Sequence, residues 1–249
     1  SSSSAASDVY KRQDEQRSQS IDGHAIHNST FPSQYGYDYF YNKFGVDFFS
    51  DNNNRLANST QPTLSDGLNV RFAPDGATFE IDSLWHIESG QQLIVFVDNN
   101  LVISDSAGGE NRIIQVDAGG YLAFIVSGNI TIDQSVGYTN PSGLPSAFAL
   151  PNAVVPNVEG IYLADGSFVV ANNNNSSLSD KKFIGAGTFV GWGGVNLNRT
   201  FDDGVFGMAW HNQNPTETFI YRPDFLLNTP MVMKQSIHEW REVDPRTAN

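Results

Sequence analysis

Two stretches of the chain share one order of apolar and polar positions. Residues 92–106 read QLIVFVDNNLVISDS and residues 121–135 read YLAFIVSGNITIDQS, which is an apolar run, a two-residue break and then an alternation. When Trp85 is aligned with Ile114, the offset of 29 residues holds without a gap through the whole unit. A repeat of this length, in a unit too small to bury its own apolar face, indicates stacked units as in a solenoid.

Each unit holds three short apolar segments separated by turns, at residues 85–87, 93–97 and 101–103 in the first unit. Three strands in each repeat are typical of a right-handed parallel β-helix, so we predict an all-β, single-stranded solenoid of this kind. The alternation in the third segment predicts Leu101 inside and Val102 outside. The second segment is apolar on both faces, so its outer side needs a cover.

Less regular strand-turn-strand pieces precede and follow the two units. The offsets after the first become 38 residues, from Val126 to Ala164, and then 21, from Ala164 to Gly185. Antiparallel hairpins are an alternative for these pieces, because Asp-Gly turns favour hairpins. The gapless 29-residue offset favours the parallel stack instead. The predicted breaks hold residues that tolerate positive φ: Asp75-Gly76, Asp98-Asn99, Ser127-Gly128, Asp165-Gly166 and Ala186-Gly187.

An aromatic stretch, YGYDYFYNKFGVDFF, precedes the repeats. Its Tyr37, Phe40, Tyr41 and Phe44 are spaced at offsets of 0, 3, 4 and 7, which predicts one stripe of a short helix. Aromatic stripes at helical spacing usually pack inward, so we expect this helix to cover the outer side of the second strands rather than to bind a ligand.

These patterns predict four parts of the chain. The opening SSSSAASDVYKRQ resembles a translated adapter sequence, of the kind found at the ends of assembled metagenomic reading frames. Residues 1–34 are therefore expected to be an artefactual or disordered lead-in. An aromatic capping segment and loop follow at 35–67, the parallel β-helix at 68–214, and a C-terminal cap and tail at 215–249.

Composition narrows the range of functions. The 27 acidic residues exceed the 14 basic ones, and a net charge of −13 disfavours nucleic acids and anionic membrane surfaces as partners. No apolar run approaches the roughly 18 residues of a membrane-spanning helix, so no membrane insertion is expected. The absence of cysteine excludes disulfides, thiolate metal sites and cysteine nucleophiles.

Polysaccharide lyases and glycosidases also use β-helices, and their chemistry needs paired titratable groups a few ångströms apart. The stretch NRTFDDGVFGMAWHNQ is the candidate for such a site. Neighbouring acids on a strand point to opposite faces, so a turn with solvated acids beside core tryptophans is the favoured interpretation. The candidate catalytic residues are Arg199, Asp202, Asp203 and His211, and the candidate ligand-binding residues are Trp192 and Trp210.

Metal ligation has weaker support. His24 and His27 lie in the lead-in and lack a third ligand. Oxygen-rich stretches at 51–54 and 97–105 match neither an EF-hand loop nor a glycine-rich calcium repeat. We therefore expect no metal site and no cofactor, with calcium as the remaining alternative.

Several segments carry a resemblance to known proteins: GGYLAFIVSGNITID, VEGIYLADGSF, FVGWGGVNLNR and FIYRPDFLLNTP. They look like parts of uncharacterised secreted or surface proteins from uncultured bacteria, and the short apolar turns are similar to those of bactofilin-like polymers. The resemblance implies a β-solenoid and export, but those proteins have no established activity that could be carried over to this chain. The uneven offsets depart from the uniform short coils of a bactofilin.

The sequence thus predicts a non-enzymatic structural or adhesive module that is extracellular or at the cell surface. Its expected partner is a polysaccharide or another cell-surface molecule. The alternatives are a polysaccharide lyase or glycosidase on a β-helix scaffold, and a self-assembling scaffold protein.

Overall fold

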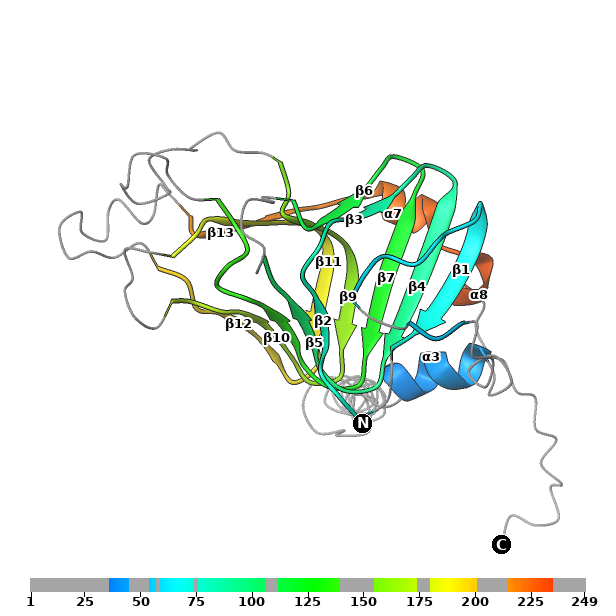
Figure 1. Ribbon diagram of the computed structural model, residues 1–249, viewed down its shortest axis with the longest axis horizontal. Coiled ribbons are helices and arrows are strands. Elements are labelled where there is room, and N and C mark those ends of the chain that lie inside the picture. The colour runs from blue at the N-terminus through cyan, green and yellow to red at the C-terminus, as the bar shows by residue number, and fades with distance from the viewer. Residues whose placement is uncertain are drawn as a thin grey trace, which may run out of the picture.

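The computed structural model describes residues 36–44, 54–56, 59–73, 76–105, 112–138, 155–173, 180–200 and 215–234. Within these ranges the chain is mostly β-strand, arranged in three parallel sheets with three short helices at their sides (Figure 1). No helix in these ranges has both the length and the apolar character needed to cross a membrane.

Sheet A holds the longest strands. Its members, in spatial order, are β1 (Gly67–Phe72), β4 (Gln91–Val97), β7 (Tyr121–Val126), β9 (Val158–Ala164), β11 (Phe183–Gly191) and β13 (Glu217–Ile220). Sheet B runs in the order β12 (Gly194–Leu197), β10 (Ser167–Val170), β8 (Ile130–Ile132), β5 (Leu101–Ile103) and β2 (Phe79–Ile81). Sheet C pairs β3 (Trp85–Ile87) with β6 (Ile114–Val116), and the helices are α3 (Tyr37–Phe44), α7 (Asp224–Asn228) and α8 (Met231–Lys234).

Successive strands visit the sheets in turn, so each passage through sheets A and B makes one rung of a stack. Trp85 pairs with Ile114, Leu93 with Leu122 and Leu101 with Ile130, all in parallel and all 29 residues apart. Every pairing between two of the strands named above is parallel. The prediction of a chain built mostly from stacked parallel strands is confirmed, and the hairpin alternative is wrong for the described strands.

The predicted offset after Ala164 is wrong. Ala164 pairs with Gly191, and Val158 pairs with Gly185, so this step spans 27 residues rather than 21. The predicted break at Ala186-Gly187 lies inside β11, and the chain turns at Trp192 and Gly193 instead.

Two paired glycines explain how β11 continues through that point. Gly187 and its partner Gly160 both have positive φ, at 136° and 142°. A Cβ atom at Gly187 would lie 1.8 Å from the carbonyl oxygen of Gly160, so a side chain there would push the two strands apart. The glycine signals a close approach of two strands here, and not a turn.

Apolar side chains of all three sheets fill the interior. In each of the three-residue strands β3, β5, β6 and β8, the first and last residues are buried and the middle residue is partly exposed. This pattern confirms the predicted alternation. Aromatic rings stack from rung to rung inside: centroids lie 5.8 Å apart for Trp85 and Phe124, 5.5 Å for Phe124 and Tyr162, and 5.1 Å for Tyr162 and Phe189.

Helix α3 covers the outer face of sheet A, as the aromatic stripe predicts. The rings of Tyr37 and Phe44 lie edge-on to Phe96, with centroids 5.7 and 5.4 Å away. Both oxygens of the Asp165 carboxylate accept from the Tyr37 backbone N–H, at 3.1 and 3.2 Å. The first turn of the helix is thereby attached to the corner between β9 and β10.

Asparagines join the rungs at the corner between sheets A and B. The Asn129 N–H donates to Asn100 Oδ1 at 2.8 Å, and Asn129 Oδ1 accepts from the Ser167 N–H at 2.7 Å. The glycines beside them leave no room for a side chain, because a Cβ at Gly166 would lie 2.3 Å from Asn129 Oδ1. Each asparagine thus satisfies a backbone group of the next rung.

We predict that Asn129→Ala lowers the free energy of unfolding by about 1 kcal/mol, because the Ser167 N–H loses its acceptor. Urea denaturation followed by circular dichroism measures the change. Asn196→Ala, at an exposed position of β12, is the matched control and should stay within about 0.5 kcal/mol of the wild type. Equal losses for the two variants would contradict the role of the corner asparagine.

Candidate functional site

Only part of the predicted polysaccharide site lies in the described residues. Arg199 and Trp192 are described, whereas Asp202, Asp203, Trp210 and His211 lie outside the described residues. Trp192 precedes β12 and Arg199 follows it, so the strand holds these two candidates at its opposite ends. Trp192 lies at the turn, 37% exposed, and its backbone N–H donates to the Ala164 carbonyl at 2.9 Å.

Arg199 is buried, and its guanidinium bonds to the backbone. Its side chain donates four hydrogen bonds of 2.7 to 2.9 Å to carbonyl oxygens of earlier segments. The cation also lies 5.6 Å from the Phe183 ring centroid. Burial lowers the pKa of Arg199 to about 10, and the nearby carboxylate of Glu217 opposes that shift. The accepting carbonyls belong to Ala171, Val136, Lys181 and Asp133.

These contacts make Arg199 a link between rungs. A guanidinium carries five N–H donors, and four of the Arg199 donors point at backbone carbonyls. The backbone N–H of Arg199 donates to Glu217 Oε1 at 2.8 Å, which brings β13 to the same corner. The geometry therefore gives Arg199 a structural role, with one donor left for any other contact.

A second charged cluster, which the sequence pattern did not reveal, surrounds the buried Glu159. Its Oε1 accepts from Arg112 Nη2 at 3.1 Å, and its Oε2 accepts from Arg222 Nη1 and from the Val116 N–H. Arg222 also holds Asp224 through two bonds of 2.8 and 2.7 Å. These residues come from three separate segments, so no spacing in the sequence links them.

Neither cluster forms a metal site. Within the described ranges no group of three or more His, Cys, Asp or Glu side chains is close enough to hold an ion. His86 Nε2 lies 3.0 Å from Asp117 Oδ1 at the surface. The pKa of Asp117 is lowered, first by its hydrogen bond with His86 and then by one with Gln115.

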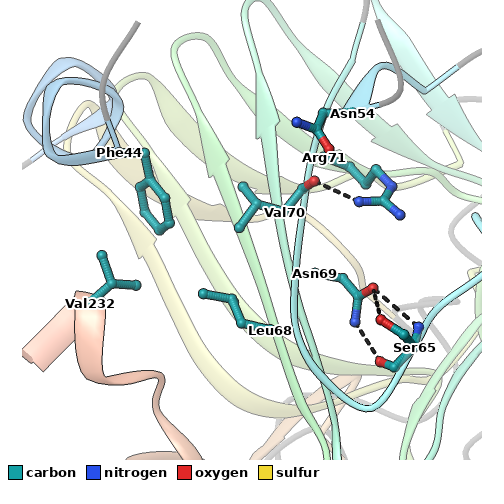
Figure 2. A pocket seen from close by; sticks show the side chains of 8 residues that line it. All are labelled: Phe44, Asn54, Ser65, Leu68, Asn69, Val70, Arg71 and Val232. Carbon is teal, nitrogen blue, oxygen red and sulfur yellow. Dashed lines mark hydrogen bonds between the residues drawn. The ribbon is translucent and has the colours of Figure 1, made fainter. Parts of the chain in front are cut away.

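The two ends of the stack differ in chemistry. At the first rung, the positions of β1 that pair with the interior Leu93 and Val95 hold Asn69 and Arg71. Asn69 Nδ2 donates to the Ser65 carbonyl at 2.7 Å. Figure 2 shows these polar side chains on one side of β1, where Asn69 bonds to Ser65 of the chain before β1 and Arg71 bonds to the carbonyl of Val70. The N-terminal end of the interior is therefore covered by the chain before β1, through the buried Leu56 and through the hydrogen bonds of Asn69.

Figure 2 also shows a small hollow at β1, which residues from both sides of the strand line, Leu68 and Val70 on one side and Asn69 and Arg71 on the other. Leu68 and Val70 face Phe44 of α3 and Val232 there, and the hollow measures about 490 Å³. It belongs to the contact between α3, β1 and the C-terminal helical segment rather than to the interior of the stack.

Within the described residues, the C-terminal end of the stack is open and apolar. A hollow of about 490 Å³ lies there, and among the residues that the structure describes no charged side chain lines it. Val195 and Leu197 of β12 pair with Phe168 and Val170, which are fully buried, yet they are themselves 50% and 47% exposed. We name this surface the open end; its lining residues are Gly187, Thr188, Phe189, Val195, Leu197, Phe219 and Tyr221.

The open end follows from the stacking itself. Inward positions of each rung are covered by the next rung, and in the described residues β12 and β13 have a strand neighbour on one side only. The interior aromatic stack also ends here, because Phe219 lies 5.1 Å from Phe189 and is 41% exposed. An exposed apolar end between two strand edges is a typical site for protein contact.

Comparison with known proteins gives no relative: no protein-family model, no curated protein and no solved structure matches the chain.

We predict that Arg199→Lys lowers the free energy of unfolding by about 2 kcal/mol or more, because lysine cannot donate to four carbonyls in the planar arrangement of arginine. Urea denaturation measures the loss. The same change at the exposed Arg55 is the control, expected within about 0.5 kcal/mol of the wild type. An Arg199→Lys chain as stable as the wild type would argue against the link between rungs.

Proposed function

We propose that the chain is a right-handed, single-stranded parallel β-helix that serves as a non-enzymatic structural and adhesive module of the bacterial cell exterior. The ordered passage from sheet A to sheet B, and through sheet C in the first two repeats, supports a coil of this kind. The right hand is the hand of about 98% of crossover connections between parallel strands.

The charged clusters support a structural role. Arg199 binds backbone carbonyls of several segments, and Glu159 is enclosed by two arginines and a backbone N–H. Paired carboxylates that flank a sugar need free faces and unequal pKa values. The two described clusters differ from such a site, because Arg199 and Glu159 both direct their hydrogen bonds to groups of the same chain.

The open end is the single observation that carries the adhesive part of the proposal. Its exposed apolar side chains and two strand edges favour a partner that adds strands and apolar side chains to the last rung. The partner is a second copy of this chain. The N-terminal end is covered by the chain before β1, whose Leu56 is buried in the core, so stacking of one end on the other is disfavoured and two open ends meet in a two-fold contact.

The cell exterior is favoured by the surface composition and by the resemblance of the repeats to secreted and surface proteins of bacteria. A net charge of −13 and an absence of cysteine suit an exported module that does not depend on disulfides. Screening of the like charges by salt should strengthen the contact between two copies.

We predict that Val195→Lys weakens self-association about tenfold or more, because a lysine ammonium at the centre of an apolar contact loses its hydration. Sedimentation equilibrium over a wide concentration range measures the constant. Leu227→Lys is the matched control: Leu227 is 80% exposed on α7, outside the lining of the open end, and its substitution should leave association unchanged.

Three results would overturn the proposal. A monomer at every concentration and salt level would remove the two-fold contact. Binding on a glycan array that Val195→Lys abolishes would make the open end a sugar site instead. Depolymerisation of an acidic polysaccharide, lost in Asp202→Asn or Asp203→Asn, would establish the enzyme alternative.

A further inference from the structure

The chain turns back after the last rung. From β13 it returns along the side of the stack toward the first rungs, where α7 and α8 lie beside sheet A (Figure 1). The backbone carbonyl of Asn228 accepts a hydrogen bond from Gln92 Nε2 at 2.9 Å, and the backbone carbonyl of Met233 accepts one from Lys43 Nζ of α3 at 3.3 Å. We name residues 222–234 the return segment; it joins the last rung to the first.

The return segment buries one face only. Phe225 is 1% exposed and its ring lies edge-on to Tyr121, with centroids 6.5 Å apart. On the opposite face, Leu226, Leu227 and Met231 are all more than half exposed. The segment contributes no strand to any sheet, so the hydrogen bonds of the rungs do not depend on it.

Its charged attachment is concentrated at Arg222. The guanidinium bonds to Glu159 and Asp224, contacts the Val116 carbonyl at 3.3 Å and lies 4.4 Å from the Phe225 ring centroid. The hydrogen bond between Gln92 and the Asn228 carbonyl joins two neutral groups, and the bond to the Met233 carbonyl comes from the flexible side chain of Lys43. Removal of Arg222 still leaves Glu159 paired with Arg112 and with the Val116 N–H.

We propose that the return segment is a strap that detaches as a unit, with Arg222 as its fastener, and uncovers the outer face of sheet A around Tyr121. Detachment breaks the charged cluster at Arg222 and the apolar contacts of Phe225, Pro230 and Met233 while the three sheets stay paired. The strap is independent of the open end, because its contacts lie on the side of the stack. It therefore gives the module a second surface that is covered in one state and exposed in the other.

The groups around Arg222 belong partly to the return segment and partly to the stack. The charged groups in contact with Arg222 are Asp224 and Glu159. Glu159 in turn interacts with Arg112 and with the buried Tyr162. Asp117, beside Val116, is paired with His86. The pKa of Asp224 is lowered from its ordinary 3.8, first by its hydrogen bonds from Arg222. Asp224 and Arg222 both belong to the return segment, so their pair holds the guanidinium in position within the segment and does not itself join the segment to the stack.

Hydrogen exchange with mass spectrometry on the full chain at neutral pH tests the strap. In Arg222→Gln we expect amide exchange in residues 222–234 to rise at least about tenfold, while β4 and β7 keep wild-type protection. Arg55→Gln removes the same charge from an exposed site and is the matched control. Asp224→Asn, a milder change, should give a smaller increase in the same residues.

Two outcomes would overturn the proposal. Unchanged exchange in residues 222–234 of both variants would show that Phe225 and the neutral bonds hold the segment without Arg222. Protection lost from β4 and β7 together with the segment would show that the segment is an integral part of the stack.

Discussion

In a parallel stack, successive residues of a strand hydrogen-bond alternately to the rung above and the rung below, so side chains at equal positions lie on top of one another. This constraint requires that every rung place apolar groups inside and that every corner satisfy the backbone of the next rung. The column of Phe124, Tyr162 and Phe189 meets the first requirement. Asn100 and Asn129 meet the second at the corner between sheets A and B.

The sequence predicts those parts of the fold that repeat. The 29-residue offset identifies the pairing of Leu93 with Leu122, because stacked side chains impose a period on the chain, and the aromatic stripe identifies α3. The step to β11 was mispredicted, because Gly187 marks a close approach of strands rather than a turn. The roles of Arg199 and Glu159 left no signal, since their partners lie up to 66 residues away without periodicity.

The same constraint gives the stack two unlike ends and a separate side. At the first rung Asn69 bonds to Ser65, and Leu56 of the chain before β1 is buried in the core, so the interior is covered there. Val195 and Leu197 keep the apolar character of the interior at the last rung, so the interior continues to an exposed surface. A structural module needs stability along its length and a contact surface at defined places, and this arrangement supplies both.

Disulfide trapping in this cysteine-free chain tests the stacked register most directly. Val102 and Thr131 are partners on adjacent rungs, about 5 Å apart at Cα, which suits a disulfide. Glu80 and Thr131 are two rungs apart, about 10 Å, which does not. The account predicts an intramolecular disulfide in the Val102→Cys, Thr131→Cys chain and none in the Glu80→Cys, Thr131→Cys chain. A disulfide in the second chain, or none in the first, would contradict it.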